Sequence, residues 1–163
     1  MIRAAAKNDA EAIAALWTEA YFDEGEGGRD RPYSRSDFEE TETAAAHLLV
    51  AEMDGAVVGV VALLSPGEPS SAVALEDEAE LARLVVSSTA RGLGIGRALA
   101  DRCADLARRE GWPAISLWSR PYQRAGHCLY ESLGYQRQPE RDSTDETGFG
   151  RLVFRLELNH STN

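Results

Sequence analysis

The chain has 163 residues, a hydrophobic fraction of 44% and a formal net charge of −10, from 27 acidic and 17 basic side chains. This length predicts one domain with a substantial core, and the hydrophobic fraction excludes a disordered chain. The acidic balance argues against nonspecific nucleic-acid binding, which needs a basic surface. No apolar run approaches the roughly 20 residues that span a bilayer, and the N-terminus lacks the apolar segment of a signal peptide. We therefore expect a cytoplasmic protein that binds neither nucleic acid nor a membrane.

Cysteine and histidine usage predicts no metal site. Cys103 and Cys128 fall in expected helices and lack any C-x-x-C or Cys/His ligand spacing. The histidines at 47, 127 and 160 form no ligand cluster either. Two scattered thiols of this kind are typical of packed side chains in a reducing compartment.

The first part of the chain predicts a strand and two helices. Residues 1–6 form the expected strand, and apolar residues at i, i+3 and i+4 predict an amphipathic helix over 9–22. Asn8 is its expected cap, with Glu11 completing a pair like a capping box. Residues 23–32 read as a loop, after which Ser34 or Ser36 can cap a short helix that ends near Thr43.

A β-hairpin comes next. The apolar runs 47–53 and 56–64 are separated by Asp54-Gly55, a strong signal for a tight hairpin turn. A loop containing Pro, Ser and Gly follows over 65–77, and a further strand is expected over 78–86.

The second half of the chain alternates helices with short strands. We expect a helix over 94–110, a strand over 114–118, a helix over 124–133, a strand over 136–138, a loop over 141–150 and a last strand over 151–158. Hairpins followed by βαβα indicate an α/β (α+β) fold with a mixed sheet. The expected domain is 1–158, with 159–163 as a frayed C-terminal tail.

A glycine-rich loop joins the expected strand 78–86 to the following helix. Glycines at 92, 94 and 96 allow backbone N–H groups to approach a ligand closely, since no Cβ intervenes. The start of a helix offers unpaired N–H donors and a partial positive charge, which together favour phosphate. Arg91 and Arg97 bracket the loop with two further positive charges. The segment therefore predicts a pyrophosphate-binding loop.

The spacing of this loop discriminates among known phosphate sites. A P-loop needs Gly-Lys-Ser/Thr, and the only lysine of the chain is Lys7. A dinucleotide fingerprint counted from Gly94 needs a third glycine where Leu99 stands. The spacing that fits is Arg-x-x-Gly-x-Gly, formed by Arg91, Gly94 and Gly96, and it resembles the acyl-CoA loop of the GCN5-related N-acetyltransferases (the GNAT family). A glycine-softened turn with no ligand is the plainer alternative.

The resemblance extends over essentially the whole chain, because the order of elements matches the acetyltransferase fold. It implies a single domain whose mixed, mostly antiparallel central sheet is flanked by about four helices. It also implies acetyl-CoA as the donor, with no metal. The implied contacts are strand backbone at Leu84, Val85 and Val86 for the pantetheine arm, the loop Arg91, Gly92, Leu93, Gly94, Ile95, Gly96 and Arg97 for the pyrophosphate, and Gln123 where family members often carry asparagine.

A second motif points to a catalytic residue. Leu-Tyr-Glu-Ser-Leu-Gly-Tyr at 129–135 resembles the segment in which family members place a tyrosine near the thioester sulfur. Tyr130 sits about 100° round the helix from the apolar face, so it need not be plain core. A phenol with a pKa of about 10 stays protonated at neutral pH and can protonate a departing thiolate. The alternative is a packing aromatic.

The general base is less well defined by the sequence. Glu80 is the candidate, because many family members carry a glutamate on this strand and burial would raise its pKa toward the operating pH. Strict alternation puts Glu80 on the face of Ala82, Leu84 and Val86, and a β-bulge in the strand would re-aim it. A solvated carboxylate at the strand end is an equally weighted alternative.

Together these features predict an acyl-CoA-dependent N-acyltransferase that moves an acetyl group to a primary amine by direct attack. A non-catalytic module that senses acyl-CoA is the alternative. The acceptor, a small-molecule or peptide amine, should lie between the first two helices and the loops at 23–33 and 137–150. The resemblance also allows a homodimer.

Overall fold

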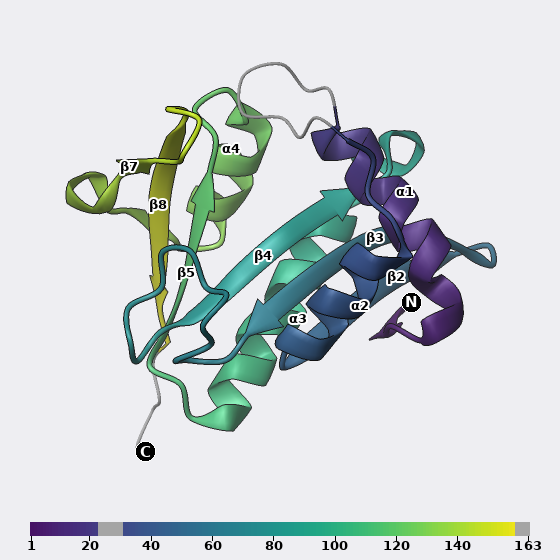
Figure 1. Cartoon of the computed structure of the whole chain (residues 1–163). Helices are drawn as coiled ribbons and strands as arrows, with labels where there is room; N and C mark the ends of the chain where they lie inside the picture. The colour runs from purple at the N-terminus through teal and green to yellow at the C-terminus, as the bar shows by residue number, and fades with distance from the viewer. Residues whose placement is uncertain (23–30, 159–163) are drawn as a thin grey trace.

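The computed structural model describes residues 1–22 and 31–158, and within them eight strands form one sheet with the order β1-β2-β3-β4-β5-β8-β6, β7 pairing with β8 (Figure 1). The strands are β1 (Ile2–Ala4), β2 (His47–Met53), β3 (Ala56–Leu64), β4 (Ala79–Val86), β5 (Ala114–Ser119), β6 (Gln136–Arg137), β7 (Ser143–Thr144) and β8 (Gly150–Glu157). The helices are α1 (Ala10–Tyr21), α2 (Arg35–Ala44), α3 (Ile95–Glu110) and α4 (Arg124–Ser132).

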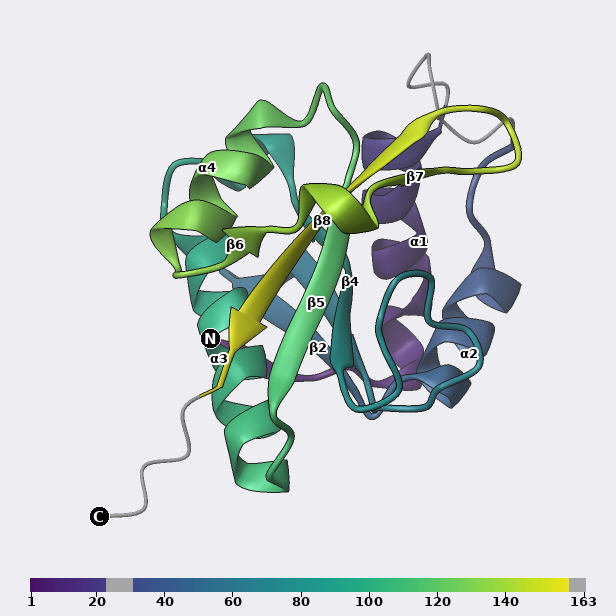
Figure 2. The same cartoon turned by 90° about the vertical axis from the view of Figure 1, so that its left-hand side faces the viewer.

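Helices cover both faces of the sheet, and each face has its own apolar cluster (Figures 1 and 2). On one face, α1 and α2 bury Trp17 and Phe38 against β2, β3 and β4. On the other, α3 packs Leu99 and Cys103 against the sheet, together with side chains of β5 and β8. Since alternate residues of a strand point to opposite faces, β2, β3 and β4 each contribute to both clusters. No described helix is both long and apolar enough to cross a membrane.

The expected fold class is confirmed: four helices flank a mixed, mostly antiparallel sheet, and β4–β5 is its one parallel pair among the described residues. The predicted hairpin turn is also confirmed. Asp54 and Gly55 both have positive φ, 52° and 79°, as a type I′ turn requires.

Three local expectations are wrong. Residues Lys7–Asp9 form a 3-10 turn, so α1 begins at Ala10 and Asn8 does not cap it; the Asp9 carboxylate instead accepts a hydrogen bond from the Ala6 N–H. The expected loop 141–150 contains the two-residue strand β7. Cys103 is buried as expected, but Cys128 is exposed. The parts of the predicted loop and tail at 23–30 and 159–163 lie outside the described residues.

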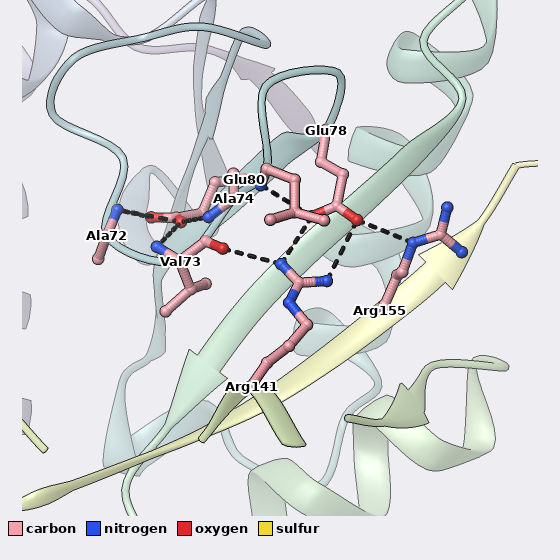
Figure 3. Close-up of polar contacts among 8 residues, drawn as sticks. Ala72, Val73, Ala74, Glu78, Glu80, Arg141 and Arg155 are labelled. Carbon is pink, nitrogen blue, oxygen red and sulfur yellow. Dashed lines mark hydrogen bonds and ion pairs between the residues drawn. The ribbon is translucent and has the colours of Figure 1, made fainter. Parts of the chain in front are cut away.

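A buried carboxylate joins the start of β4 to the C-terminal part of the chain (Figure 3). Glu78 is 1% exposed, and it accepts hydrogen bonds from Arg141 at 2.8 and 3.2 Å and from Arg155 at 2.8 Å. Burial alone would raise the pKa of this carboxyl, but the hydrogen bonds from Arg141, from the Leu75 N–H and from Arg155 outweigh it. The pKa of Glu78 therefore lies below its ordinary value.

Glu78→Gln should lower the free energy of unfolding at neutral pH by on the order of 3 kcal/mol, because two guanidinium groups lose their carboxylate. A lowered pKa in the folded state means that this contribution is complete above the unfolded pKa of about 4.3 and is lost as the pH falls through the folded value. In urea unfolding, the gap between wild type and variant should therefore begin to shrink below about pH 5. A gap that stays constant down to about pH 3 would contradict this assignment.

The matched control is Glu40→Gln, which removes one exposed carboxylate from α2. Its free energy of unfolding should stay within about 0.5 kcal/mol of the wild-type value throughout the same range.

Candidate functional site

Strands β4 and β5 separate soon after they begin. They pair at Ala79–Ile115 and Glu80–Ser116 only, and both strands then continue with no ladder between them (Figure 1). From Leu81 to Val86, the edge of β4 that faces β5 therefore pairs with no described strand. Such an edge can bind an extended ligand through its backbone groups, in the manner of an added strand.

A β-bulge lies in β4 where the two strands diverge. Val85 pairs with Val60 and Ala82 pairs with Ala62, so Arg83 and Leu84 together oppose the single residue Val61. Arg83 has φ of 54°, one of two positive values among the described non-glycine residues. The expected bulge is thus present, but it re-aims Arg83 rather than Glu80.

The bulge changes which residues of β4 share a face. Arg83 contacts the rings of Trp17 and Tyr33, and Val85 belongs to the cluster under α1 and α2. Leu84 packs with the cluster under α3. Strict alternation would place Arg83 on the face of α3 and Leu84 on the face of α1 and α2, the reverse of what is observed. The extra residue of the bulge accounts for this difference.

The glycine loop, residues 91–97, leads from β4 into α3. Gly92 and Gly94 have φ of 81° and 80°, and a Cβ built on either would meet no atom within 4 Å. The cap hydrogen bond of α3 runs from the Ala98 N–H to the Gly94 carbonyl at 3.0 Å. The N–H groups before Ala98 in the first turn thus have no intrahelical acceptor, as at any helix start, and can bind an anion.

Two further glycines fix where this loop stands. A Cβ on Gly59 of β3 would lie 3.0 Å from Leu99 Cδ1 and 3.1 Å from Ile95 Cγ2, so the first turns of α3 rest on bare backbone. A Cβ on Gly96 would lie 3.4 Å from Leu129 Cδ2, which brings the start of α3 against α4. The sequence reading missed Gly59, although a glycine inside an apolar strand signals a close approach.

Several predicted cofactor contacts are engaged with the chain itself. Arg97 donates to the Ser132 hydroxyl and so links α3 to α4. The side-chain carbonyl of Gln123 accepts from the Ser119 hydroxyl and from the Arg120 N–H, each at 2.9 Å. Gln123 thereby closes the turn before α4. Arg91 is exposed beside the loop, as are Gly92, Leu93 and Gly94.

Tyr130 lies on α4, at the same end of the sheet as the glycine loop. Its ring packs against Tyr135 and Phe154, with centroid distances of 5.8 Å to each. Gly126 is close to it, since a Cβ there would be 3.4 Å from Tyr130 Cε2 and 4.0 Å from the Ser119 hydroxyl at the end of β5. Burial raises the pKa of Tyr130 to about 12, so the phenol keeps its proton at neutral pH.

Glu80 lies at the other end of β4, and its carboxylate is occupied (Figure 3). It is 2% exposed and accepts hydrogen bonds from the backbone N–H groups of Ala72, Val73 and Ala74, at 2.8 to 3.1 Å. Six residues of strand, about 20 Å, separate it from Val86. These contacts anchor the loop 65–78; the general-base role of Glu80 stays a prediction.

The described part of the chain contains no candidate metal site, and its buried thiol, Cys103, is poorly suited to catalysis. No group of three or more His, Cys, Asp or Glu side chains there could hold a metal ion. Burial raises the pKa of the Cys103 thiol to about 12, which makes it a poor nucleophile.

Comparisons with known proteins agree with this geometry. The profile of the Acetyltransferase (GNAT) family matches residues 10–135. Among curated proteins, N-acetylaspartate synthetase from Danio rerio is 34% identical over 116 residues, covering 68% of this chain and 39% of the relative. N-acetyltransferase family 8 member 2 from Rattus norvegicus is 39% identical over 88 residues, covering 54% and 38%. The chain thus spans about two fifths of the length of these relatives.

Solved structures share the whole fold. A Salmonella typhimurium protein, described as an acetyltransferase with its cofactor acetyl-CoA, superposes with a TM-score of 0.79 at 23% identity, covering 100% of this chain and 96% of that one. A phosphinothricin acetyltransferase from Sinorhizobium meliloti, in complex with acetyl-CoA, gives 0.77 at 19% identity, covering 99% and 90%. With the family profile matched over most of its length, this chain belongs to the GNAT family of acetyltransferases.

Proposed function

We propose that the protein transfers an acetyl group from acetyl-CoA to an amine, with both substrates bound together. The observation that carries the proposal is the free edge of β4 beside the glycine loop, with Tyr130 at the same end of the sheet. The similar structures described with acetyl-CoA, and relatives named as N-acetyltransferases, support the choice of donor and reaction.

The residues present fit coenzyme A. Open space over Gly92 and Gly94, together with the unpaired N–H groups of the first turn of α3, suits the pyrophosphate. The free edge of β4 at Leu84 and Val86 suits the amides of the pantetheine arm. Acetyl-CoA supplies the acetyl group as a thioester, which is activated toward amines.

Each residue then has a defined task. Backbone N–H groups at the free edge of β4 hydrogen-bond the carbonyl oxygen as negative charge develops on it. The amine nitrogen bonds to the acetyl carbon while the C–S bond breaks, and Tyr130 donates its proton to the departing sulfur. The proton that the amine gives up restores the phenol.

Thiol release from acetyl-CoA, measured across a panel of amino acids, polyamines, antibiotic amines and peptides, tests the proposal. Turnover with at least one class supports it. Tight binding of acetyl-CoA without release for any amine would contradict it and favour an acyl-CoA sensor.

Gly94→Ala should weaken coenzyme A binding at least tenfold, because the new methyl group stands where the pyrophosphate approaches the helix start. Gly111→Ala is the matched control. Gly94 and Gly111 bracket α3 with φ of 80° and 79°, and neither has an atom within 4 Å of an added Cβ. Both variants introduce the same backbone strain. The difference between their dissociation constants for coenzyme A, measured by isothermal titration, therefore reports the effect of the methyl group on the ligand. Equal affinities would refute the assignment of the glycine loop.

Tyr130→Phe should lower kcat by about 100-fold or more, because the thiolate then leaves unprotonated, while the Kd for acetyl-CoA stays unchanged. Tyr135→Phe is the control in the same aromatic cluster, since its buried hydroxyl has no hydrogen-bond partner among the described residues. That variant should retain full turnover. Because the pKa of Tyr130 is about 12, its ionisation should cause no loss of rate up to about pH 9. Unchanged turnover of the Tyr130 variant would remove the acid role.

Glu80→Ala and Glu80→Gln distinguish an anchor from a base. Alanine leaves three partly buried backbone N–H groups without their acceptor and should lower the free energy of unfolding by about 2–4 kcal/mol. Glutamine keeps one oxygen for these donors and should retain kcat within a few-fold. A loss of kcat above about 100-fold in the glutamine variant, with its melting temperature preserved, would instead establish Glu80 as the base.

A further inference from the structure

Arg83 is held in an unusual way for a strand residue. Its guanidinium carbon lies 4.9 Å from the ring centroid of Trp17 and 5.2 Å from that of Tyr33. The two rings are themselves 5.8 Å apart, so the guanidinium is fixed against both. Its backbone is in the left-handed region, which is strained for a non-glycine residue. The strained backbone of Arg83 therefore holds a cation close to the point where β4 separates from β5.

In the part of the chain that the structure describes, this cation lacks a full set of partners. Arg83 Nη1 is buried and has no hydrogen-bond partner among the described residues. The same holds for Nε1 of Trp17, the fully buried side chain that the guanidinium contacts. A buried donor without an acceptor is costly, and two in neighbouring side chains are best explained by an acceptor that arrives from outside.

Two further unpaired donors lie on β5 and β8, one of them on Ser116, in the last pair that joins β4 to β5. The Ser116 hydroxyl on β5 and Arg151 Nε on β8 are also buried without a partner in the described structure. Their neighbours Leu117 and Leu152 pack in the cluster under α3, so Ser116 and Arg151 lie on the opposite face, the same face as Arg83. Arg151 rests on Trp118, with its guanidinium carbon 5.1 Å from the ring centroid.

Two of these unpaired groups carry full positive charges and none is an acid. An amine alone would need the reverse, a carboxylate or carbonyl lining. An oxygen anion satisfies guanidinium donors, and a carboxylate is the anion that an amine substrate commonly carries. Because the chain is strongly acidic overall, unpaired arginines on this face stand out as a local reversal of charge.

We propose that Arg83 binds a carboxylate of the acceptor, so that the substrate is an amino acid or another amine bearing a carboxylate. The proposal rests on the acetyltransferase function proposed above. Arg83 acts as a specificity-determining residue: it orients the amine toward the free edge of β4, while Trp17 and Tyr33 keep the guanidinium in place. Arg151 adds positive charge on the far side of the divergence.

The test uses matched acceptor pairs, several amino acids and their carboxamides, with the full-length protein and acetyl-CoA. Wild type should favour the acid over the amide by about 10- to 100-fold in kcat/KM, the range for a charged hydrogen-bonded pair. Arg83→Gln should reduce that preference to a few-fold, mainly by raising KM for the acid, and Arg83→Lys should keep part of it. Arg102→Gln, which removes an exposed arginine from α3, is the control and should keep the full preference.

Equal use of acid and amide by wild type would overturn the proposal, as would a preference that survives Arg83→Gln. If that variant does not fold, the wild-type pairs and Arg83→Lys still decide. Thermal stabilisation by the amino acids alone provides a second readout. Binding that depends on Arg83, without turnover of any amine, would refute the transferase function and keep the carboxylate site. If no amino acid is bound and none is turned over, the carboxylate site is overturned.

Discussion

One extra residue in β4 determines how the two ends of this strand differ. Arg83 and Leu84 share the place opposite Val61, and the ladder between β4 and β5 ends three residues before this bulge, at Glu80. A continuous parallel pair would satisfy the edge of β4 with its own sheet and leave no backbone for a ligand. The same irregularity turns Arg83 toward α1. The bulge thus places a positive group beside the free edge of β4, at a conformational cost within one residue.

The opposite end of β4 is closed by buried acidic groups. Glu78 joins Arg141 and Arg155, and Glu80 gathers three backbone N–H groups of the loop 65–78. Arg141 also donates to the Val73 carbonyl, so both carboxylates hold the same loop (Figure 3). These contacts brace the strands where they are paired, which allows them to separate at the other end without loosening the sheet. The hydrogen bonds of Glu78 and Glu80 thus give both carboxylates a structural role in holding this loop.

Sequence reasoning predicted the order of the elements except β7, the hairpin turn at Asp54-Gly55 and the position of the glycine loop, because each depends on local chemistry or on the periodicity of apolar residues. It anticipated that β4 contains a bulge but not which residue it would re-aim, since the position depends on register with β3. The unpaired donors at Trp17 and Arg83 were invisible for a related reason: a sequence records a polar group but not whether a partner reaches it. Arg97 illustrates the converse, because its intramolecular partner Ser132 comes from another helix, 35 residues along the chain.

Gly59 lies outside the glycine loop, yet α3 packs directly on this strand position through Leu99 and Ile95. The geometry of the proposed donor site therefore depends on how α3 packs against β3 in the core. A methyl group added there crowds the Leu99 and Ile95 side chains at the start of the helix that bears the glycine loop, and it changes only the packing beneath that loop. Substitutions in β3 can thus weaken donor binding, although none of the substituted residues lies at the surface that would contact the donor.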